Sequence, residues 1–342
     1  MTSSRRLWMV FGRIGQALPA LVGVVVVTFL LTRALPGDPA AYFAGPAADA
    51  HSIQQVRQAL GLDRSLPEQF LVYVGDLLRG DLGMSISTGQ PVADELARRL
   101  PASLELTLGA LLLSLAVAVP MGVLAATRPG TLVDHACRVV ATAGVSLPTF
   151  FTGIALVFVF YYLLGWAPAP IGRLDFAYLS PPDITGFYTV DALLAGDTET
   201  AYAAASQLFL PMLTLALFTL APIARMTRGA MLQALNSDFI RTARAAGLSR
   251  RVVLHRYAFR NAMLPVITTL GMVFSFTLGA NVLVEKVFAW PGIGSFAVDA
   301  LVVSDYAAVQ GFVLSMAVLF VALNLAIDIA YTLIDPRIQS DD

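Results

Sequence analysis

The arginine-rich stretch Asn236–Pro265 reads NSDFIRTARAAGLSRRVVLHRYAFRNAMLP and lies between two strongly apolar segments. The chain as a whole is 57% hydrophobic and only 13% charged, yet residues 225–262 hold eight arginines against a single acid, Asp238. Basic residues that flank membrane spans stay on the cytoplasmic side. A long polar loop of this charge therefore predicts a cytoplasmic surface that meets a partner.

Apolar segments of sufficient length to cross a membrane lie on both sides of this loop. A span needs roughly 20 apolar residues, because the hydrocarbon core is about 30 Å thick. Prolines inside or beside the segments, such as Pro148, Pro211 and Pro222, are expected to kink or end helices rather than break them. The six predicted spans are Ile14–Thr32, Leu104–Ala126, Val139–Trp166, Leu208–Ala224, Met263–Val284 and Gly311–Ile334.

The distribution of arginines predicts the orientation of the spans. Basic residues dominate the N-terminus and the loops after the second and fourth spans (Arg5, Arg6, Arg13, Arg128, Arg138 and the eight of residues 225–262). Acids dominate the opposing loops (Asp175, Asp183, Asp191, Asp197 and Glu199 against Arg173; Glu285, Asp299 and Asp305 against Lys286). The positive-inside bias thus predicts an all-α integral membrane protein with six transmembrane helices and both termini in the cytoplasm. Residues 1–13 and 335–342 would be cytoplasmic, and residues 14–334 would form the membrane-spanning domain.

The segment between the first two spans, residues 34–101, reads as an external loop of short amphipathic helices. Ser65 and Glu68 match a capping box, and the glycines of Gly80–Gly83 supply a stop. A second short helix is expected over Val92–Leu100. The loop is either a packing cap over the bundle or a docking and solute-guiding surface, because an amphipathic stripe shows only that something covers it. The predicted stripe is Phe70, Leu71, Val74, Leu77 and Leu78.

Residues that would support catalysis or bind a cofactor are scarce. The one lysine, Lys286, is not part of a phosphate-binding G-x-x-x-x-G-K-[ST] loop. The one cysteine, Cys137, excludes a multi-cysteine metal site, and the three histidines lie far apart. We therefore expect no enzyme activity, cofactor, metal or nucleic-acid partner. Within the spans only Glu105 and Asp328 are ionisable, which favours a driving force applied from outside over a self-contained secondary transporter or channel. That alternative stays open at this point.

Asn236–Pro265 resembles the conserved cytoplasmic "EAA" loop of the permease subunits of bacterial ATP-binding-cassette importers. Arg241, Thr242 and Ala243 stand at the E-A-A positions, followed by Gly247 and by Leu-Pro at 264–265. The form DFIRTARAAGLS is typical of the peptide/nickel branch, and the dipeptide permeases are the most similar. Other motifs of that branch occur in order over residues 10–338: RALPGDP (Arg33–Pro39), LGLD (Leu60–Asp63), GDLG.S (Gly80–Ser85), RMTR (Arg225–Arg228) and WPGIG (Trp290–Gly294).

The resemblance implies a permease subunit in a bacterial inner membrane that imports dipeptides, oligopeptides or related small solutes. It also implies four kinds of contact: a second, homologous permease, two cytoplasmic ATPase subunits, an extracytoplasmic solute-binding protein and membrane lipid. Nickel chelates, glutathione and sugars are carried by the same branch, and the sequence does not choose among them.

The loop residues themselves predict a short coupling helix for the ATPases. Ser237 or Asn236 can cap it, and Gly247 can end it in a left-handed conformation. Phe239, Ala243 and Ala246 would lie near one face. The coupling residues predicted within the loop at 225–262 are Asp238, Phe239, Arg241, Thr242, Ala243, Arg244, Ala246 and Gly247. In the fifth span, Phe274, Phe276 and Asn281 are candidates to line the solute pathway.

Overall fold

The protein is all-helical, as predicted. The computed structural model describes residues 3–34, 39–45 and 47–334, and the regular elements of these residues are helices, apart from one β-bridge between Met84 and Pro91. The chain forms two compact units, each described by itself: unit 1 comprises residues 1–101 and 292–325, and unit 2 residues 102–291 and 326–342. Leu35–Asp38 of the RALPGDP motif, the tail at 335–342 and the side chain of Asp328 lie outside the described part of the chain.

Unit 1 is built from the N-terminal helices and the helices that follow residue 291. A small apolar core around Val92, Phe296 and Ala308 joins the start of α5 to α13 and α14. The helices of unit 1 are α1 (Ser3–Ala34), α2 (Pro39–Ala44), α3 (Ala50–Ala59), α4 (Leu66–Leu78), the start of α5 (Val92–Thr127), α13 (Ile293–Val302) and most of α14 (Tyr306–Ile334).

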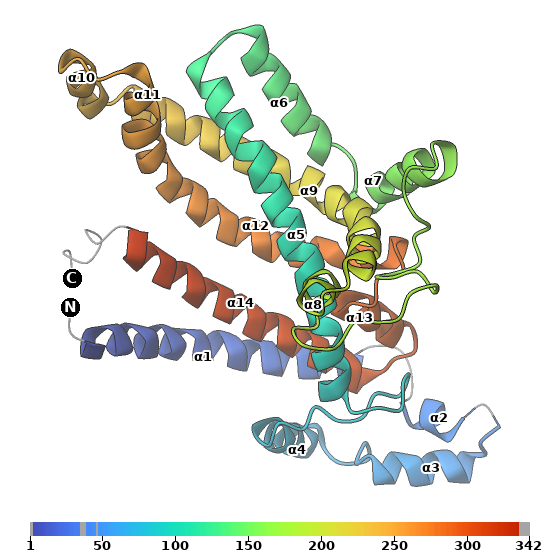
Figure 1. Ribbon diagram of the computed structural model, residues 1–342. Coiled ribbons are helices and arrows are strands. Elements are labelled where there is room, and N and C mark those ends of the chain that lie inside the picture. The colour runs from blue at the N-terminus through green and yellow to red at the C-terminus, as the bar shows by residue number, and fades with distance from the viewer. Residues whose placement is uncertain (1–2, 35–38, 46, 335–342) are drawn as a thin grey trace. The chain divides into compact units, whose positions relative to one another are not determined.

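Unit 2 is arranged around α9, and nineteen of the 38 residues of that helix are buried. α9 packs against α6, α8 and α12, and apolar clusters join it to α5 (Figure 1). The elements of unit 2 are the rest of α5, α6 (Leu132–Val145), α7 (Thr149–Leu156), the π-helix η1 (Val157–Leu163), α8 (Tyr188–Leu194), α9 (Thr198–Leu235), α10 (Asp238–Ala245), α11 (Arg250–Val252), the π-helix η2 (Val253–Phe259), α12 (Arg260–Val287) and the end of α14.

Four helical segments of the described residues are long and apolar enough to cross a membrane, and a bent pair would make a fifth. Each overlaps a predicted span, and the predicted fourth span lies inside an unbroken α9 despite Pro211 and Pro222. The apolar part of α1 among the described residues, Leu18–Leu31, is shorter than these four segments. The four segments are Val92–Thr127, Thr198–Leu235, Arg250–Val287 and Tyr306–Ile327.

The predicted third span, Val139–Trp166, is not one straight helix. α6 and the following α7–η1 segment meet at an angle of 99°. Pro148 lacks an N–H and disfavours helical backbone at the residue before it. The helix is interrupted here, whereas α9 continues through Pro211 and Pro222. The prolines were expected to kink or end helices rather than break them, and at Pro148 the helix of the predicted span is broken. Gly144 brings α6 close to α9, because a Cβ at this position would collide with the carbonyl oxygen of Leu217.

The loop between α1 and α5 contains the predicted helix with its capping box. α4 begins after Ser65, whose N–H donates to the Glu68 carboxylate at 3.1 Å. Of the predicted apolar stripe, Leu71 and Leu78 are exposed (70% and 85%) and the other three residues are half-buried. The expected separate helix at 92–100 is instead the first part of α5, which continues through Pro101.

Candidate functional site

The arginine-rich loop contains a short helix, α10, that is fixed at both ends. Ser237 occupies the N-cap position, although its hydroxyl donates to the carbonyl of Ala234 rather than accepting from the helix. At the other end Gly247 has φ +76°. Its N–H donates to the Arg244 carbonyl at 3.0 Å, and the Leu248 N–H donates to the Ala243 carbonyl at 3.3 Å. This pair of hydrogen bonds is the Schellman motif, which needs a left-handed residue at the glycine position.

One face of α10 is packed against the rest of unit 2. Ile240 is fully buried and Ala243 is 6% exposed, in a cluster with Met231 of α9 and Val253 of η2. Phe239 is 42% exposed and does not belong to this cluster. Phe239 and Ala243, predicted to share a face, are therefore divided between the outside and the inside. The other predicted coupling residues are exposed: Asp238, Arg241, Thr242, Arg244, Ala246 and Gly247.

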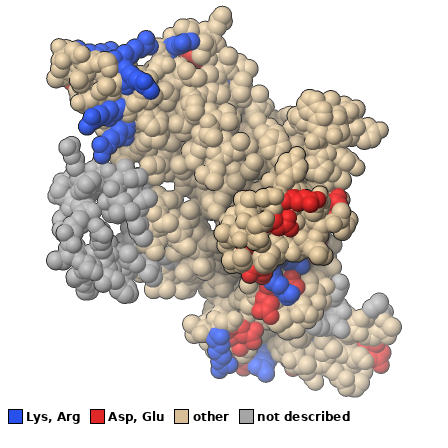
Figure 2. Space-filling view, viewed as in Figure 1, with Lys and Arg blue, Asp and Glu red and all other residues tan. Residues whose placement is uncertain are grey.

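The charges around α10 are largely unneutralised. Arg241 lies 3.1 Å from Asp238, but both side chains are highly exposed (78% and 92%), and such pairs contribute little to stability. Figure 2 shows arginine side chains gathered over the loop that carries α10 and α11, while acidic side chains lie at the opposite end of unit 2, over α8 and the start of α9. The arginine end of unit 2 thus presents one apolar ring, Phe239, within a positive field.

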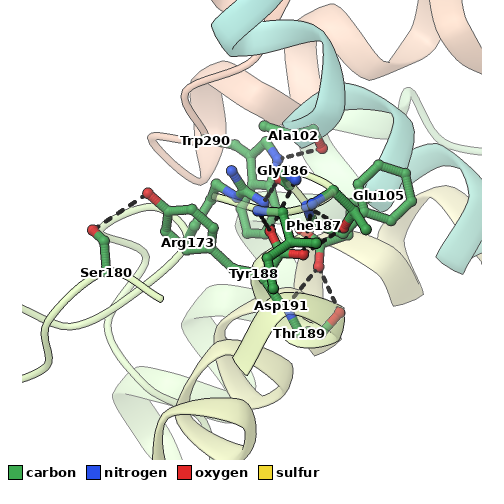
Figure 3. Close-up of polar contacts among 12 residues, drawn as sticks. Ala102, Glu105, Arg173, Ser180, Gly186, Phe187, Tyr188, Thr189, Asp191 and Trp290 are labelled. Atoms are coloured by element: carbon green, nitrogen blue, oxygen red, sulfur yellow. Dashed lines mark hydrogen bonds and ion pairs between the residues drawn. The ribbon is translucent and has the colours of Figure 1, made fainter. Parts of the chain in front are cut away.

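The opposite end of unit 2 contains a buried ion pair that the sequence did not predict. Glu105 of α5 is 5% exposed and accepts from Arg173 at 2.7 Å (Figure 3). The second oxygen of Glu105 accepts from both the N–H and the hydroxyl of Thr189 in α8, at 3.0 and 2.6 Å. Arg173 also donates to the Gly186 carbonyl at 2.6 Å and lies 3.6 Å from the ring centre of Tyr188. The pair fastens the irregular segment 164–187 to α5.

A second carboxylate, Asp191 of α8, organises the same segment. It is 1% exposed and accepts from the N–H and hydroxyl of Thr185 and from the N–H of Gly186 at 2.7–2.8 Å, and from the N–H of Ile184 at 3.4 Å. Burial by itself would raise the pKa of Asp191, but these hydrogen bonds outweigh it and hold the pKa below its usual range. The folded loop therefore favours the ionised form of Asp191.

The three residues proposed for the pathway lie in different surroundings. Phe274 is buried, and so is Asn281, whose amide donates to Glu285 at 3.0 Å and to Thr107 at 3.2 Å. Glu285 also accepts from Ser103 at 2.5 Å. α12 thus extends beyond the predicted end of the fifth span, and Glu285, expected in an external loop, is buried within the helix. Of the three candidates only Phe276, 68% exposed, reaches the surface of unit 2.

Phe276 lines a groove of about 470 Å³ between α9 and α12. The walls are mainly apolar and aromatic, with one cation, Arg225, among them. The lining residues are Phe218, Thr219, Pro222, Arg225, Met226, Thr269, Met272, Val273 and Phe276.

Sequence reasoning missed the anchor of α10 and the buried charges at the far end. For the ion pair a sign was present: Arg173 is the only base among five acids of its loop, and Glu105 lies at the end of an apolar run. Charges removed from water are normally paired, so these two could have been matched. For a metal, no group of three histidine, cysteine or acidic side chains comes together within the described part of the chain.

Comparison with known proteins covers almost the whole chain. Residues 118–340 match the family described as "Binding-protein-dependent transport system inner membrane component", and residues 7–107 match the N-terminal domain of the same kind of component. A probable D,D-dipeptide transport system permease protein of Escherichia coli (strain K12) is 45% identical over 93% of each chain. A di/tripeptide transport system permease protein of Pseudomonas aeruginosa is 42% identical over 96% of this chain and 97% of its own length. A dipeptide transport system permease protein of E. coli K12 is 37% identical over 97% and 99%. The chain therefore belongs to the family of inner membrane components of binding-protein-dependent transport systems.

Proposed function

We propose that this chain is the permease subunit of an ATP-driven importer of dipeptides and related short peptides. The substrate class rests on the names of the relatives, three of which are permeases for D,D-dipeptides, di/tripeptides and dipeptides. The chain would form the pathway together with a second permease, receive solute from an extracytoplasmic binding protein, and take its energy from two separate ATPase subunits. It has no phosphate-binding loop of its own.

The observation that carries the proposal is the construction of α10. A helix of eight residues, stopped at both ends and held by Ile240 and Ala243, leaves Phe239 and several arginines facing outward. A lipid-binding role explains arginines, at about 1 kcal/mol each near an anionic surface, but not a rigid helix with an anchored face. A groove on a soluble ATPase is the better match, because buried aromatic anchors dominate protein interfaces.

The proposed topology has six spans and cytoplasmic termini, with α6 and α7–η1 together counted as the third span. The charge separation within unit 2 supports this orientation, since the arginines of the α10 loop and the acids near α8 lie at opposite ends (Figure 2). A reporter fused after residue 235 should be active as a cytoplasmic domain, and one fused near residue 185 as an external domain. Opposite results at both positions would remove the basis for the ATPase contact.

The groove between α9 and α12 is our candidate for this chain's side of the solute pathway. With Cys137 replaced by serine, Phe276→Cys should react with a water-soluble thiol reagent in the assembled transporter. Phe274→Cys, two residues away but buried, is the matched control and should not react. A thiol that faces lipid stays protonated and unreactive, so failure of Phe276→Cys to react would assign the groove to the bilayer.

The decisive experiment is reconstitution of the full transporter in proteoliposomes. ATP hydrolysis should be absent with this chain alone, appear with the second permease and the ATPases, and rise again with peptide-loaded binding protein. Peptide uptake should require ATP and should not be driven by an imposed proton gradient. Uptake by this chain alone, driven by a gradient, would establish the secondary transporter instead.

A further inference from the structure

Asp134 and Arg228 form an ion pair between two helices of unit 2 at the end that carries α10. Asp134 lies in the first turn of α6, and Arg228 lies in α9. The guanidinium donates through Nε to Oδ1 at 2.7 Å and through Nη2 to Oδ2 at 2.8 Å. The carboxylate is 1% exposed. Two parallel, charge-assisted hydrogen bonds fix distance and angle together, which a single contact does not.

The same carboxylate holds the turn before α6. The Gly130 N–H donates to Oδ2 at 3.0 Å, so the connection from α5 is attached to the ion pair as well. A second arginine, Arg138, lies farther away at 3.7 Å, and its side chain is 49% exposed. Because Arg138 belongs to α6 itself, its contact with Asp134 joins no two helices. Of the two arginines, only Arg228 joins Asp134 to α9.

The rest of the α5–α6–α9 contact is close but apolar. A Cβ on Gly122 of α5 would lie 2.6 Å from Thr227 Cβ and 2.8 Å from the Ala224 carbonyl oxygen, so these backbones nearly touch. Apolar contacts of this kind are non-directional. Close packing at Gly122 and Gly144 holds the helices together. The Asp134–Arg228 pair adds a directional contact of fixed distance and angle.

α9 also leads directly to α10. Arg228 lies seven residues before the end of α9 at Leu235, roughly 10 Å along the axis, and α10 begins at Asp238. The buried face of α10 packs on Met231 and Ala234 of the same stretch of α9. A displacement of α10 must therefore move the end of α9 at which Arg228 lies.

We propose that the Asp134–Arg228 ion pair transmits the displacement of α10 to α6, and that Arg228 is thereby a positioning residue for coupling ATP hydrolysis to transport. The inference rests on the proposed function and adds to it the route inside the permease. Without the pair, α10 would still bind the ATPases and the ATPases would still hydrolyse ATP. α9 would then move without carrying α6 along.

The test measures peptide transported per ATP hydrolysed in the reconstituted complex. Asp134→Asn and Arg228→Gln should retain the ATPase subunits and most hydrolysis stimulated by the binding protein. Transport per ATP should fall by at least about fivefold, the lower end of usual coupling between sites. Arg228→Lys keeps the charge but loses the two-pronged geometry, and should fall between these variants and the wild type.

Two further variants separate coupling from folding. Exchanging the charges, Asp134→Arg with Arg228→Asp, should restore much of the ratio. The matched control Arg138→Gln, which alters the same carboxylate's surroundings within one helix, should stay within about twofold of the wild type, as surface substitutions do. An unchanged ratio in Asp134→Asn and Arg228→Gln overturns the inference, and so does a loss of assembly that the exchange does not restore. A wild-type complex with no ATP-driven uptake would instead overturn the proposed function itself.

Discussion

The two ends of unit 2 use arginine in opposite ways. At the end with α8, one arginine, Arg173, is 8% exposed and bonded to a carboxylate and a carbonyl, with an aromatic ring stacked against it. At the end with α10, Arg241 and Arg244 stand in solvent, with one exposed acid nearby. The first arrangement neutralises its charge within the chain, although Nε of Arg173 has no hydrogen-bond partner among the described residues. The second leaves its charges for another molecule, and this difference separates a structural charge from a docking charge.

The largest effect is expected at the α8 end of unit 2, where Arg173 is buried and paired. Glu105→Gln leaves the Arg173 guanidinium buried without its counter-charge, and breaking one side of a buried pair costs about 3–5 kcal/mol. The variant should unfold at markedly lower denaturant concentration in detergent. Replacing both residues by apolar ones of similar size, Glu105→Leu with Arg173→Met, should recover most of that loss. If Glu105→Gln is as stable as the wild type, the stability of the α8 end does not depend on the ion pair.

At the α10 end of unit 2, we expect a loss of binding to the ATPase subunits rather than a loss of folding stability. Phe239→Ala should weaken the grip on the ATPase subunits by about 2 kcal/mol or more, the usual range for an aromatic anchor. Co-purification of the ATPases measures it. Leu248→Ala is the matched control, because Leu248 is similarly exposed (38% against 42%) but lies beyond the helix. Equal retention in the two variants would remove Phe239 from the contact.

The helix stop should matter somewhat less. Gly247 has φ +76° and open space around it, so Gly247→Val is penalised by backbone strain of about 1–3 kcal/mol and not by collision. Peptide uptake should fall, with insertion into the membrane unchanged. Gly247→Asn should retain most uptake, because asparagine tolerates the left-handed region. If valine and asparagine behave alike, the conformation of this residue is not what positions α10.

The smallest effect is a pH dependence at the α8 end of unit 2, where Asp191 lies. The folded-state pKa of Asp191 is depressed, so its contribution to stability is complete above the unfolded value of about 4 and is lost as the pH falls through the folded value. Amide hydrogen exchange at Thr185 and Gly186 should therefore accelerate in acid, after correction for the intrinsic rate. Asp191→Asn should show the acceleration at neutral pH, and Asp175→Asn, at an exposed turn, should not. Equal corrected exchange rates in acid and at neutral pH would show that ionised Asp191 does not hold this loop.

Features encoded by neighbouring residues were predictable from the sequence. The capping box at Ser65 and the left-handed Gly247 each depend on a few consecutive positions, and both are present. The arginine clustering and most spans depend on composition over some twenty residues, which is also local.

Features that depend on distant partners were not predictable. The pairing of Glu105 with Arg173 joins residues 68 positions apart, and although each stands out in its own segment, only the fold brings them into contact. In α10, Phe239 and Ile240 are adjacent apolar residues in a helix of eight, so periodicity alone does not say which one faces inward. The packing of Met231 and Val253 decides it. The turn at Pro148 was visible as a proline, but its 99° angle reflects the packing of α6 on α9 as well.

The right angle at Pro148 constrains how the third span can sit in a bilayer. α6 has 14 residues and so reaches about 21 Å, short of the roughly 30 Å of hydrocarbon. Because α7–η1 runs nearly perpendicular to it, only one of the two can follow the bilayer normal. Where α6 follows the normal, the exposed rings of the second segment, among them Phe158 and Tyr162, occupy nearly one depth. Aromatic rings favour the headgroup level, so we expect a rotation of this helix pair to displace lipid and to make transport depend on bilayer thickness.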